Sequence, residues 1–153
     1  MDGDGLRTKL YQSMTDNLTR VQRSYMMSRV RSKDTKPELM VRKLSHAQGL
    51  RFRKHCPWLP GRPDLTFVTT KVTVFVDGDY WHGWRFPAWK DKMSLYWKQK
   101  IEGNRKRDQS NFRKLRRDGW LVIRLWEHEV ERDAESCISR IQVAVRLRSK
   151  KLS

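Results

Sequence analysis

The sequence predicts an α/β fold: a single domain in which helices flank a mixed central β-sheet, in the order α-α-β-β-β-α-β-α. Three observations support this fold class. The 153 residues are the length of one domain. Apolar residues recur with a helical period in four segments, and four shorter segments are β-rich. Glycines and prolines separate most of these segments, as expected at the ends of helices and strands.

The first helix follows an N-terminal extension. Residues 1–13 combine two glycines and two acids with a weak apolar pattern, so we expect them to be flexible and the domain to span residues 14–153. Thr19 and Gln22 have the spacing of a capping box, in which each side chain bonds the other residue's backbone N–H. We expect the helix that starts there to run through Val30.

A second helix is expected over residues 35–49. Thr35 and Glu38 form another capping box, Pro37 lies in the first turn, where proline fits a helix, and a glycine ends the segment. The apolar period then changes to two over residues 50–53, which predicts a strand.

Two β-rich runs follow, residues 64–68 and 72–76, after a proline-rich loop over residues 57–63. Because only three residues separate the runs, they predict a β-hairpin. The remaining elements are a long helix over residues 94–118 with Ser94 as its cap, a strand over residues 120–126, and a final helix capped by Asp133.

The charge of the chain indicates a polyanionic partner. The formal net charge is +17, and two windows account for all of it. Residues 20–62 hold 12 basic and 2 acidic residues, and residues 98–117 hold 9 basic and 2 acidic. These windows flank a nearly neutral middle, as phosphate clamps around a site do, and the alternative is a basic surface that promotes solubility or binds RNA.

Other function classes are excluded by composition. With 37% hydrophobic residues and seven Trp, the chain is not a disordered basic tail. No run of about 18 apolar residues exists, so no transmembrane helix is expected. Cys56 and Cys137 share no metal-binding or redox spacing, and we expect reduced thiols in a cytosolic protein.

Two aspartates are the candidate metal ligands. Asp64 opens one strand of the hairpin and Asp77 ends the other, so both can lie at one edge of the sheet. Two carboxylates and a backbone carbonyl are hard oxygen ligands of the kind that Mg²⁺ takes. Such an ion polarises a phosphate and lowers the pKa of a bound water, which indicates a metal-dependent nuclease. Taken alone, each aspartate is more often a turn residue than a metal ligand.

Three further side chains are candidates for the same site. His82 can act as a general base or stabilise charge on phosphorus, or it can be a loop histidine packed between Trp81 and Trp84. Asp108 lies on the apolar stripe of the long helix and needs a partner there, either His82 or an arginine. Glu38 already has a role in its capping box, and a catalytic role would be additional.

Six aromatic residues fall within 18 positions across a loop and a helix start. Aromatic side chains can insert between base pairs, and the alternative is that half of these residues belong to the core. We expect Trp97 and one of Tyr80 and Trp81 to reach DNA, with Met26 or Met27 as further wedges. The six are Tyr80, Trp81, Trp84, Trp89, Tyr96 and Trp97.

Five segments, taken together and in order, resemble the very-short-patch repair endonucleases from about Met14 to Val130. They are MMSRVRSKDTKPEL, LPGRPDL, VFVDGDYWHG, YWKQKIEGNRKRD and DGWLVIRLWE. The resemblance implies a restriction-endonuclease-like core that nicks duplex DNA beside a T:G mismatch left by deamination of 5-methylcytosine, with Mg²⁺ as cofactor. We expect a monomer that acts on double-stranded DNA in the bacterial cytoplasm, associated with the nucleoid.

The resemblance also assigns roles to single positions. Asp64 matches the central metal ligand, the backbone carbonyl of Val76 a further ligand, and Asp77 an active-site position. His82 matches the active-site histidine, Asp108 the carboxylate that supports it, and Glu38 the glutamate of the N-terminal helix. The intercalating group is matched by Tyr80, Trp81, Trp97 and Met27.

The chain departs from the family at its structural zinc site. The family that the chain resembles commonly holds a structural zinc with Cys and His side chains around the Trp-His loop and in the strand that follows the long helix. Asp79, Trp84, Phe86 and His128 stand there in this chain, and no cysteine remains. We therefore expect no structural zinc and apolar packing of Trp84 and Phe86 in its place.

This departure lies beside the aromatics that would read the mismatch, so two alternatives stay open. One is a related nuclease that targets a modified base, a restriction site or the DNA of a mobile element. The other is a catalytically silent DNA-binding protein, against which the retained Asp64, His82 and Asp108 argue.

Overall fold

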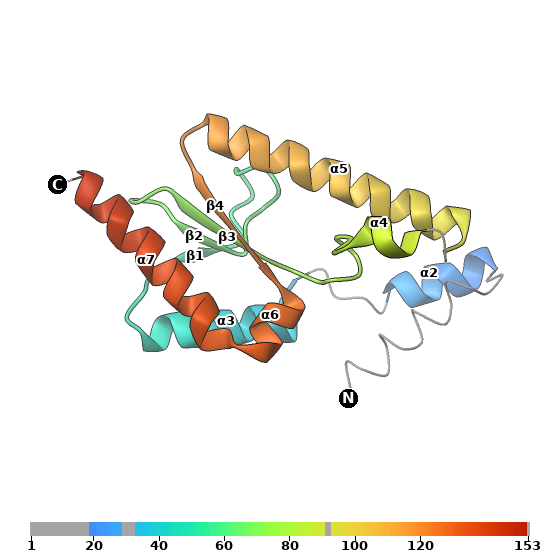
Figure 1. The fold of residues 1–153 in the computed structure, drawn as a ribbon, viewed down its shortest axis with the longest axis horizontal. Coiled ribbons are helices and arrows are strands. Elements are labelled where there is room, and N and C mark those ends of the chain that lie inside the picture. The colour runs from blue at the N-terminus through green and yellow to red at the C-terminus, as the bar shows by residue number, and fades with distance from the viewer. Residues whose placement is uncertain (1–18, 29–32, 91–92, 153) are drawn as a thin grey trace.

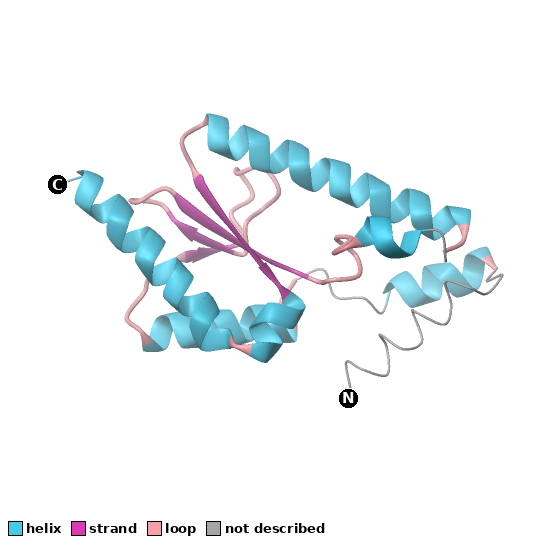
Figure 2. Cartoon of the chain, in the orientation of Figure 1, coloured by secondary structure: helices cyan, strands magenta, loops and turns pink. Residues whose placement is uncertain are grey.

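The computed structural model describes residues 19–28, 33–90 and 93–152. Its elements are, in chain order, α2 (Arg20–Ser28), α3 (Lys36–Ala47), β1 (Arg53–Lys54), β2 (Leu65–Phe67), β3 (Val72–Asp77), α4 (Phe86–Trp89), α5 (Leu95–Arg117), β4 (Leu121–Trp126), α6 (Glu127–Arg132) and α7 (Ala134–Leu152). The four strands form one mixed sheet between helices on both faces (Figures 1 and 2). The expected α/β fold is confirmed, and α4 and α6 are short helices added to the expected order.

The strands lie in the order β1-β2-β3-β4 across the sheet. β2 and β3 form the expected antiparallel hairpin, with Leu65 opposite Val74 and Phe67 opposite Val72. β4 is parallel to β3, and α5 makes the crossover that a parallel pair requires. Because β3 and β4 run in the same direction, both end at the sheet edge where β2 begins. Side chains just before β2 and at the end of β3 therefore meet at that edge.

Alternating side chains along β3 divide the core into two layers. Val72, Val74 and Val76 belong to the cluster that α3, α6 and α7 cover. Phe75 points to the other face, where its ring packs edge-on against Phe112 of α5 with centroids 4.9 Å apart. Since every residue of β3 is buried, the position of its last residue, Asp77, is fixed by packing on both faces.

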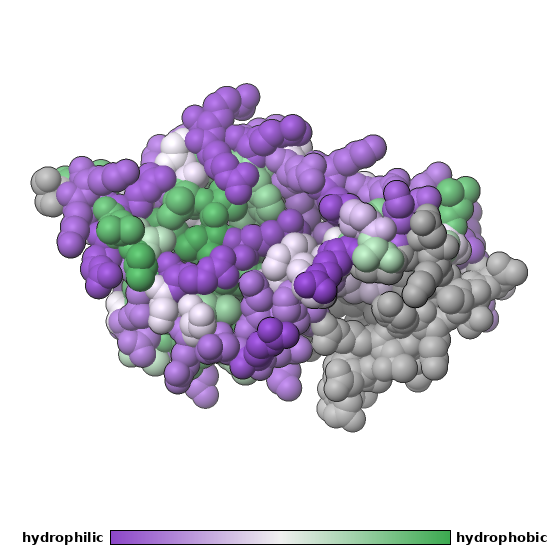
Figure 3. All heavy atoms as spheres, in the orientation of Figure 1, coloured by the Kyte–Doolittle hydropathy of each residue, from purple (hydrophilic) through white to green (hydrophobic). Residues whose placement is uncertain are grey.

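The outer surface is mainly hydrophilic on the side shown in Figure 3, and its larger hydrophobic area lies beside α7, which exposes Val143 and Leu147. No described helix has both the length and the hydrophobicity needed to span a membrane. The second basic window of the sequence becomes a charged face of α5. Its exposed cations are Lys106, Arg107, Arg113, Lys114, Arg116 and Arg117.

The strand expected over residues 50–53 is wrong in extent. Only Arg53 and Lys54 pair with β2, because β2 is three residues long and offers few pairing positions. Leu50 and Phe52 pack on the core without a strand partner, and the Phe52 ring meets Phe67 edge-on at 5.9 Å between centroids. The alternating pattern therefore reported burial of these side chains rather than strand pairing.

The predicted helix caps form only in part. Thr19 and Gln22 make both bonds of their box, from Gln22 N–H to Thr19 Oγ1 at 3.2 Å and from Thr19 N–H to Gln22 Oε1 at 2.9 Å. Ser94 stands before α5 with extended backbone, but its hydroxyl makes no capping hydrogen bond. The expectations for residues 1–13 and for Val30 lie outside the described residues.

The loop before β2 depends on a glycine, which gives a test of the fold. Gly61 has φ +76°, and a Cβ there would lie 3.0 Å from the Phe75 ring. We expect Gly61→Ala to lower the free energy of unfolding by about 1–3 kcal/mol, because the added methyl group meets strained backbone and a packed ring. Urea denaturation measures the change. Gly103→Ala is the matched control: it lies inside α5 with no atom within 4 Å of its Cβ, and should stabilise the protein by up to about 1 kcal/mol. Equal effects of the two substitutions would contradict the packing of this loop.

Candidate active site

The edge of the sheet brings the two predicted aspartates together. Asp64 directly precedes β2, and its backbone N–H bonds the carbonyl of Val74 at 2.9 Å. Its carboxylate turns across the hairpin, where Oδ2 accepts a hydrogen bond from the Val76 N–H at 2.6 Å. Asp77, the last residue of β3, follows Val76 directly and is 7% exposed. The hairpin thus places both carboxylates at one end of β3, as the sequence predicted.

The surroundings of Asp64 disfavour its negative charge. Burial raises the pKa of Asp64 to about 8, and the negative charges of Glu38 and Asp77 act in the same direction. The hydrogen bond from Val76 offsets only part of this rise. A carboxylate crowded in this way by two other acids is stabilised as an anion when a cation binds beside it. The donor atoms are hard oxygens, so the residues fit a divalent ion such as Mg²⁺.

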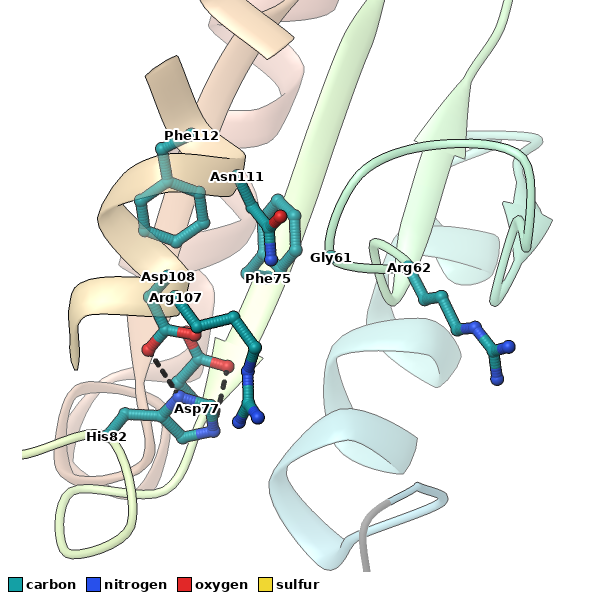
Figure 4. Close-up of a pocket in the computed structure, with 9 residues that line it drawn as sticks. All are labelled: Gly61, Arg62, Phe75, Asp77, His82, Arg107, Asp108, Asn111 and Phe112. Atoms are coloured by element: carbon teal, nitrogen blue, oxygen red, sulfur yellow. Dashed lines mark hydrogen bonds and ion pairs between the residues drawn. The ribbon is translucent and has the colours of Figure 1, made fainter. Parts of the chain in front are cut away.

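His82 lies in a network of charges at the same edge (Figure 4). Its Nδ1 is 2.7 Å from Oδ2 of Asp108, and its Nε2 is 3.5 Å from Oδ1 of Asp77. Arg124 of β4 joins the two acids, donating from Nε to Asp77 at 2.9 Å and from Nη2 to Asp108 at 2.8 Å. Asp108 therefore has both of the partners that the sequence left open, the histidine and an arginine.

Arg124 was not found by the sequence analysis. The available signal was a lone arginine within the β-rich run 120–126. In the structure its side chain passes over the rings of Phe112 and Trp126, with the guanidinium carbon 5.1 and 4.1 Å from their centroids. These stacking contacts help to hold the Arg124 guanidinium next to Asp77 and Asp108.

The network changes the pKa values of its members. Burial by itself lowers the pKa of His82, but the hydrogen bond to Asp108 and the charges of Asp77 and Asp108 outweigh it, so the pKa lies above its ordinary value of 6.5. Burial raises the pKa of Asp77, against the lowering effect of His82 and Arg124. The protonated imidazole is thus favoured next to the two carboxylates.

A cavity of about 350 Å³ opens beside this network. Arg62 and Arg107 lie on opposite sides of it, one from each basic window of the sequence (Figure 4). Arg107 reaches from α5 past Asp77 and His82, and its Nη2 bonds Oδ1 of Asn104 at 2.9 Å. The full lining is Gly61, Arg62, Phe75, Asp77, His82, Arg107, Asp108, Asn111 and Phe112.

Glu38 belongs to a second charged group. Its N–H bonds Thr35 Oγ1 at 3.4 Å, which is the expected cap. Its carboxylate turns away from the helix start, however, so the capping box is only half formed. Oε1 lies 2.6 Å from Nη2 of Arg42 and 3.0 Å from Nε2 of His55, and Arg42 also bonds Asp34. Glu38 is 1% exposed, and its carboxylate faces the site instead of capping the helix.

His55 is the second residue of the candidate site that the sequence did not mark. It lies nine positions before Asp64 in a loop without a recognisable pattern. Its backbone has φ +47°, a left-handed conformation that is unfavourable for a residue with a side chain. Its Nδ1 is 3.9 Å from Oδ1 of Asp64, so His55 lies beside both Glu38 and Asp64.

The aromatic group differs from the expectation in one member. Trp97 is 1% exposed, because it continues the buried stripe of α5, and it cannot reach DNA in this conformation. Trp81 covers it with ring centroids 5.8 Å apart, and Tyr80 meets Trp81 edge-on at 5.0 Å. Tyr80 and Trp81 are partly exposed. The side chain of Met27 lies outside the described residues.

The positions of the family's zinc site hold a different arrangement. Asp79 Oδ1 is 2.8 Å from Nδ1 of His128, and the His128 ring lies 4.1 Å from that of Trp84. Phe86 is 2% exposed, in agreement with the expected apolar packing. Among the described residues, the groups with metal-binding geometry are Asp34-Glu38-His55 and Asp77-His82-Asp108, and neither includes these positions. The absence of zinc stays a prediction.

Comparison with known proteins identifies the family. Residues 15–87 match the family described as DNA mismatch endonuclease Vsr. Over 119 residues the chain is 32% identical to the DNA mismatch endonuclease Vsr of Escherichia coli, and the match covers 74% of each chain. The chain belongs to the Vsr family. The family that five sequence motifs indicated is therefore confirmed.

Two further relatives are named type II nicking enzymes. The type II nicking enzyme V.XorIIP of Xanthomonas oryzae is 44% identical, over 76% of this chain and 88% of its own. The type II nicking enzyme V.NmeDIP of Neisseria meningitidis is 40% identical, over 86% of this chain and 90% of its own. These relationships confirm the expectation of a DNA endonuclease with a restriction-endonuclease-like fold.

The His82 network makes a prediction about ionisation. We expect Asp108→Asn to lower the pKa of His82 in the metal-free protein, because it removes the negative charge that offsets the pKa-lowering effect of burial. NMR titration of the imidazole measures this. A His82 pKa above its unfolded value adds stability at low pH, and this contribution is lost as the pH rises through the folded-state pKa. As the pH rises over that range, Asp108→Asn should therefore lose less stability than the wild type. Asp118→Asn, at the exposed end of α5, is the control, and an equal shift in both variants would refute the assignment.

Proposed function

We propose that this protein is a Mg²⁺-dependent endonuclease that acts as a monomer and nicks one strand of duplex DNA beside a T:G mismatch, in very short patch repair. The observation that carries the proposal is the sheet edge: a buried Asp64 crowded by Glu38 and Asp77, together with His82 held by Asp108. This arrangement combines a place for a cation with a group that can exchange a proton at a phosphate.

The oxygen donors would hold the ion. Asp64 and Asp77 would supply carboxylates, and Val76 its backbone carbonyl, from two neighbouring strands. When bound there, a divalent ion supplies positive charge that polarises a phosphate and lowers the pKa of water. The fit rests on the raised pKa of Asp64, since a bound cation offsets the burial and the repulsion that raise it.

His82 is the candidate for proton transfer. Its Nδ1 is bound to Asp108, so its Nε2 faces Asp77 and the cavity. The raised pKa favours the imidazolium, which can donate a hydrogen bond to a phosphate oxygen and stabilise its charge. After loss of that proton, the same Nε2 can accept one from an attacking water. Arg124 keeps both carboxylates in place and is a positioning residue for His82.

The phosphate backbone would be held from two sides. Arg62 and Arg107 flank the cavity, and the exposed cations of α5 extend the basic surface from it. Arginine binds phosphate through paired N–H donors, so these residues are suited to positioning the backbone without reading bases. Binding should therefore weaken strongly as salt concentration rises.

Recognition of the mismatch would fall to the loop that precedes His82. Tyr80 and Trp81 are partly exposed and follow the end of β3 within four residues. Trp97 lies beneath Trp81, and its indole N–H has no hydrogen-bond acceptor within the described structure. If the stack of Trp81 on Trp97 opened, the indole N–H of Trp97 could reach a hydrogen-bond acceptor. This favours a position in which the Trp97 ring is inserted beside DNA.

A second candidate is a nicking endonuclease that acts in another sequence context. Relatives in Xanthomonas and Neisseria carry the name type II nicking enzyme. Asp79 and Trp84 on the loop that carries Trp81, and His128 at the start of α6, also stand where the resemblance places the family's zinc ligands. Incubation with T:G duplexes of varied flanking sequence, with T:A duplexes and with plasmid, each with and without Mg²⁺, distinguishes the two. Nicking confined to matched DNA would reject the repair function.

Asp64→Asn tests the metal site. The variant should lose at least about 10³-fold in nicking rate in Mg²⁺ and retain duplex binding, since only the charge at the metal site is removed. Nicking assays and fluorescence anisotropy measure the two effects. Asp118→Asn is an exposed control that should keep both. Normal nicking by Asp64→Asn would show that the metal ligands are elsewhere.

The same variant has a predicted pH signature. The folded-state pKa of Asp64, about 8, lies above the ordinary value of 3.8, so the metal-free folded protein loses stability as the pH rises between these values. Asn cannot titrate, and Asp64→Asn should be more stable than the wild type at pH 8 by an amount on the order of a few kcal/mol. Urea unfolding at pH 5 and pH 8 in chelator measures this. Identical pH profiles would contradict the buried, crowded state of Asp64.

Trp81 and Trp97 should respond differently to truncation. We expect Trp81→Ala to weaken binding to a T:G duplex about tenfold more than binding to a T:A duplex, because a mismatched step is easier to open. Trp97→Ala should cost about 3–5 kcal/mol of stability, because the ring is buried. Paired binding curves and thermal melting separate these effects. An unchanged T:G to T:A ratio in folded Trp81→Ala would exclude a wedge role for that ring.

A further inference from the structure

We propose that His55 is a nitrogen ligand of the divalent ion at Asp64, which makes this site more selective for Mn²⁺ over Mg²⁺ than a set of oxygens would be. The inference rests on the proposed metal dependence and adds a residue to it. His55 reaches the site from the loop after β1, whereas the other candidate ligands lie on the β2–β3 hairpin.

The hydrogen bond to Asp34 and the close contact with Glu38 determine which nitrogen of His55 is available. Nε2 of His55 lies 3.0 Å from Oε1 of Glu38, and also 3.4 Å from Oδ1 of Asp34. A carboxylate only accepts, so Nε2 carries the proton, and Nδ1 of the neutral ring keeps its lone pair. Nδ1 is the atom that faces Asp64. An imidazole whose second nitrogen donates to a carboxylate is the usual arrangement of a metal-binding histidine.

The distance between the two donor atoms suits a shared ion. Nδ1 of His55 and Oδ1 of Asp64 are 3.9 Å apart, too far for a direct hydrogen bond. Two donors that each stand about 2.1 Å from one ion are roughly 3–4 Å from each other. The structure therefore holds a nitrogen and an oxygen donor at ligand spacing before any ion is bound.

The surroundings fix His55 in this position. Glu38 is held in turn by Arg42 at 2.6 Å, so the carboxylate that orients the ring is itself anchored on α3. The left-handed backbone of His55, with φ +47°, directs the side chain toward the acids at a cost in strain. Strain of this kind persists where the surrounding structure imposes a position, and such positions concentrate at functional sites.

The competing role is that of a counter-ion. In that case His55 neutralises Glu38 and Asp64 only when no metal is present, and a bound ion displaces it. The two roles predict opposite results, because a ligand binds the ion through nitrogen whereas a displaced counter-ion leaves an all-oxygen site. Nitrogen donors favour Mn²⁺ over the harder Mg²⁺, so metal preference also separates the roles.

Electron spin-echo envelope modulation on the Mn²⁺-loaded full chain tests the proposal directly. Nitrogen-14 modulation typical of a coordinated imidazole is expected in the wild type and in His82→Gln, and is expected to be lost in His55→Asn. Asparagine tolerates the left-handed backbone, so this variant should fold. Modulation that is absent from the wild type, or that disappears in His82→Gln and persists in His55→Asn, overturns the proposal.

Metal titrations give a second readout that does not use activity. Mn²⁺ affinity, measured from the signal of free Mn²⁺, should fall roughly tenfold in His55→Asn and in His55→Gln, while Mg²⁺ affinity, measured by competition, falls less. His46→Gln, an exposed histidine on α3 that packs on Phe52, is the matched control and should bind both ions as the wild type does. An unchanged Mn²⁺ to Mg²⁺ ratio in both His55 variants overturns the proposal.

These measurements also separate this inference from the proposed function. A wild-type chain that binds neither ion refutes the metal-dependent function and the role of His55 together. A chain that binds Mn²⁺ through Asp64, with loss of binding in Asp64→Asn but no nitrogen modulation, keeps the proposed function and refutes the role of His55 alone.

Discussion

The hydrogen bond from the Val76 N–H to Asp64, 2.6 Å long, holds a carboxylate inside the protein at the edge of the sheet. Its environment is unfavourable to an anion, since burial and two neighbouring acids raise the pKa of Asp64 to about 8. The charged side chains around it lie in two groups, one on each side. Glu38 is paired with Arg42 and His55, and Asp77 is paired with His82 and Arg124 in the other group. Among the described residues, Asp64 is left with a single ionic contact, to His55 at 3.9 Å.

The hydrophobic core keeps this arrangement of like charges in place. Each residue of β3 is buried, with valines packed toward α7 and Phe75 packed on Phe112 of α5. Asp77 cannot move away from Asp64 without disturbing both layers, and Asp108 is fixed by its place on the buried stripe of α5. The energy of apolar packing thus offsets the electrostatic cost of the site, as is common where function requires perturbed ionisation.

The loop between β3 and α4 connects the candidate active site to the partly exposed aromatics Tyr80 and Trp81. Within a few residues it carries Asp79, Trp81 and His82, and Asp79 anchors it to the start of α6 through His128. Asn104 of α5 adds a second anchor by donating to the backbone carbonyl of Trp81 at 2.8 Å. These contacts hold the position of the loop. Trp81 and His82 are adjacent in the chain, so their positions relative to each other depend on the same contacts.

The sequence by itself determined the family, the α/β fold class, the hairpin, and the placement of Asp64 and Asp77 at one end of that hairpin. These follow from local periodicity and from motifs short enough to be recognised along the chain. It also placed Asp108 on a buried helix stripe and so predicted that it needs a partner. Arg124 and His55 were decided only by the tertiary structure, since each meets partners from distant segments: Arg124 meets Asp77 from 47 positions away, and His55 meets Glu38 on another element. The burial of Trp97 was likewise settled in three dimensions, where Trp81 packs over it. Local pattern reports which face of an element is apolar, but the neighbour that covers that face, or the charge that meets it, depends on how distant segments pack together.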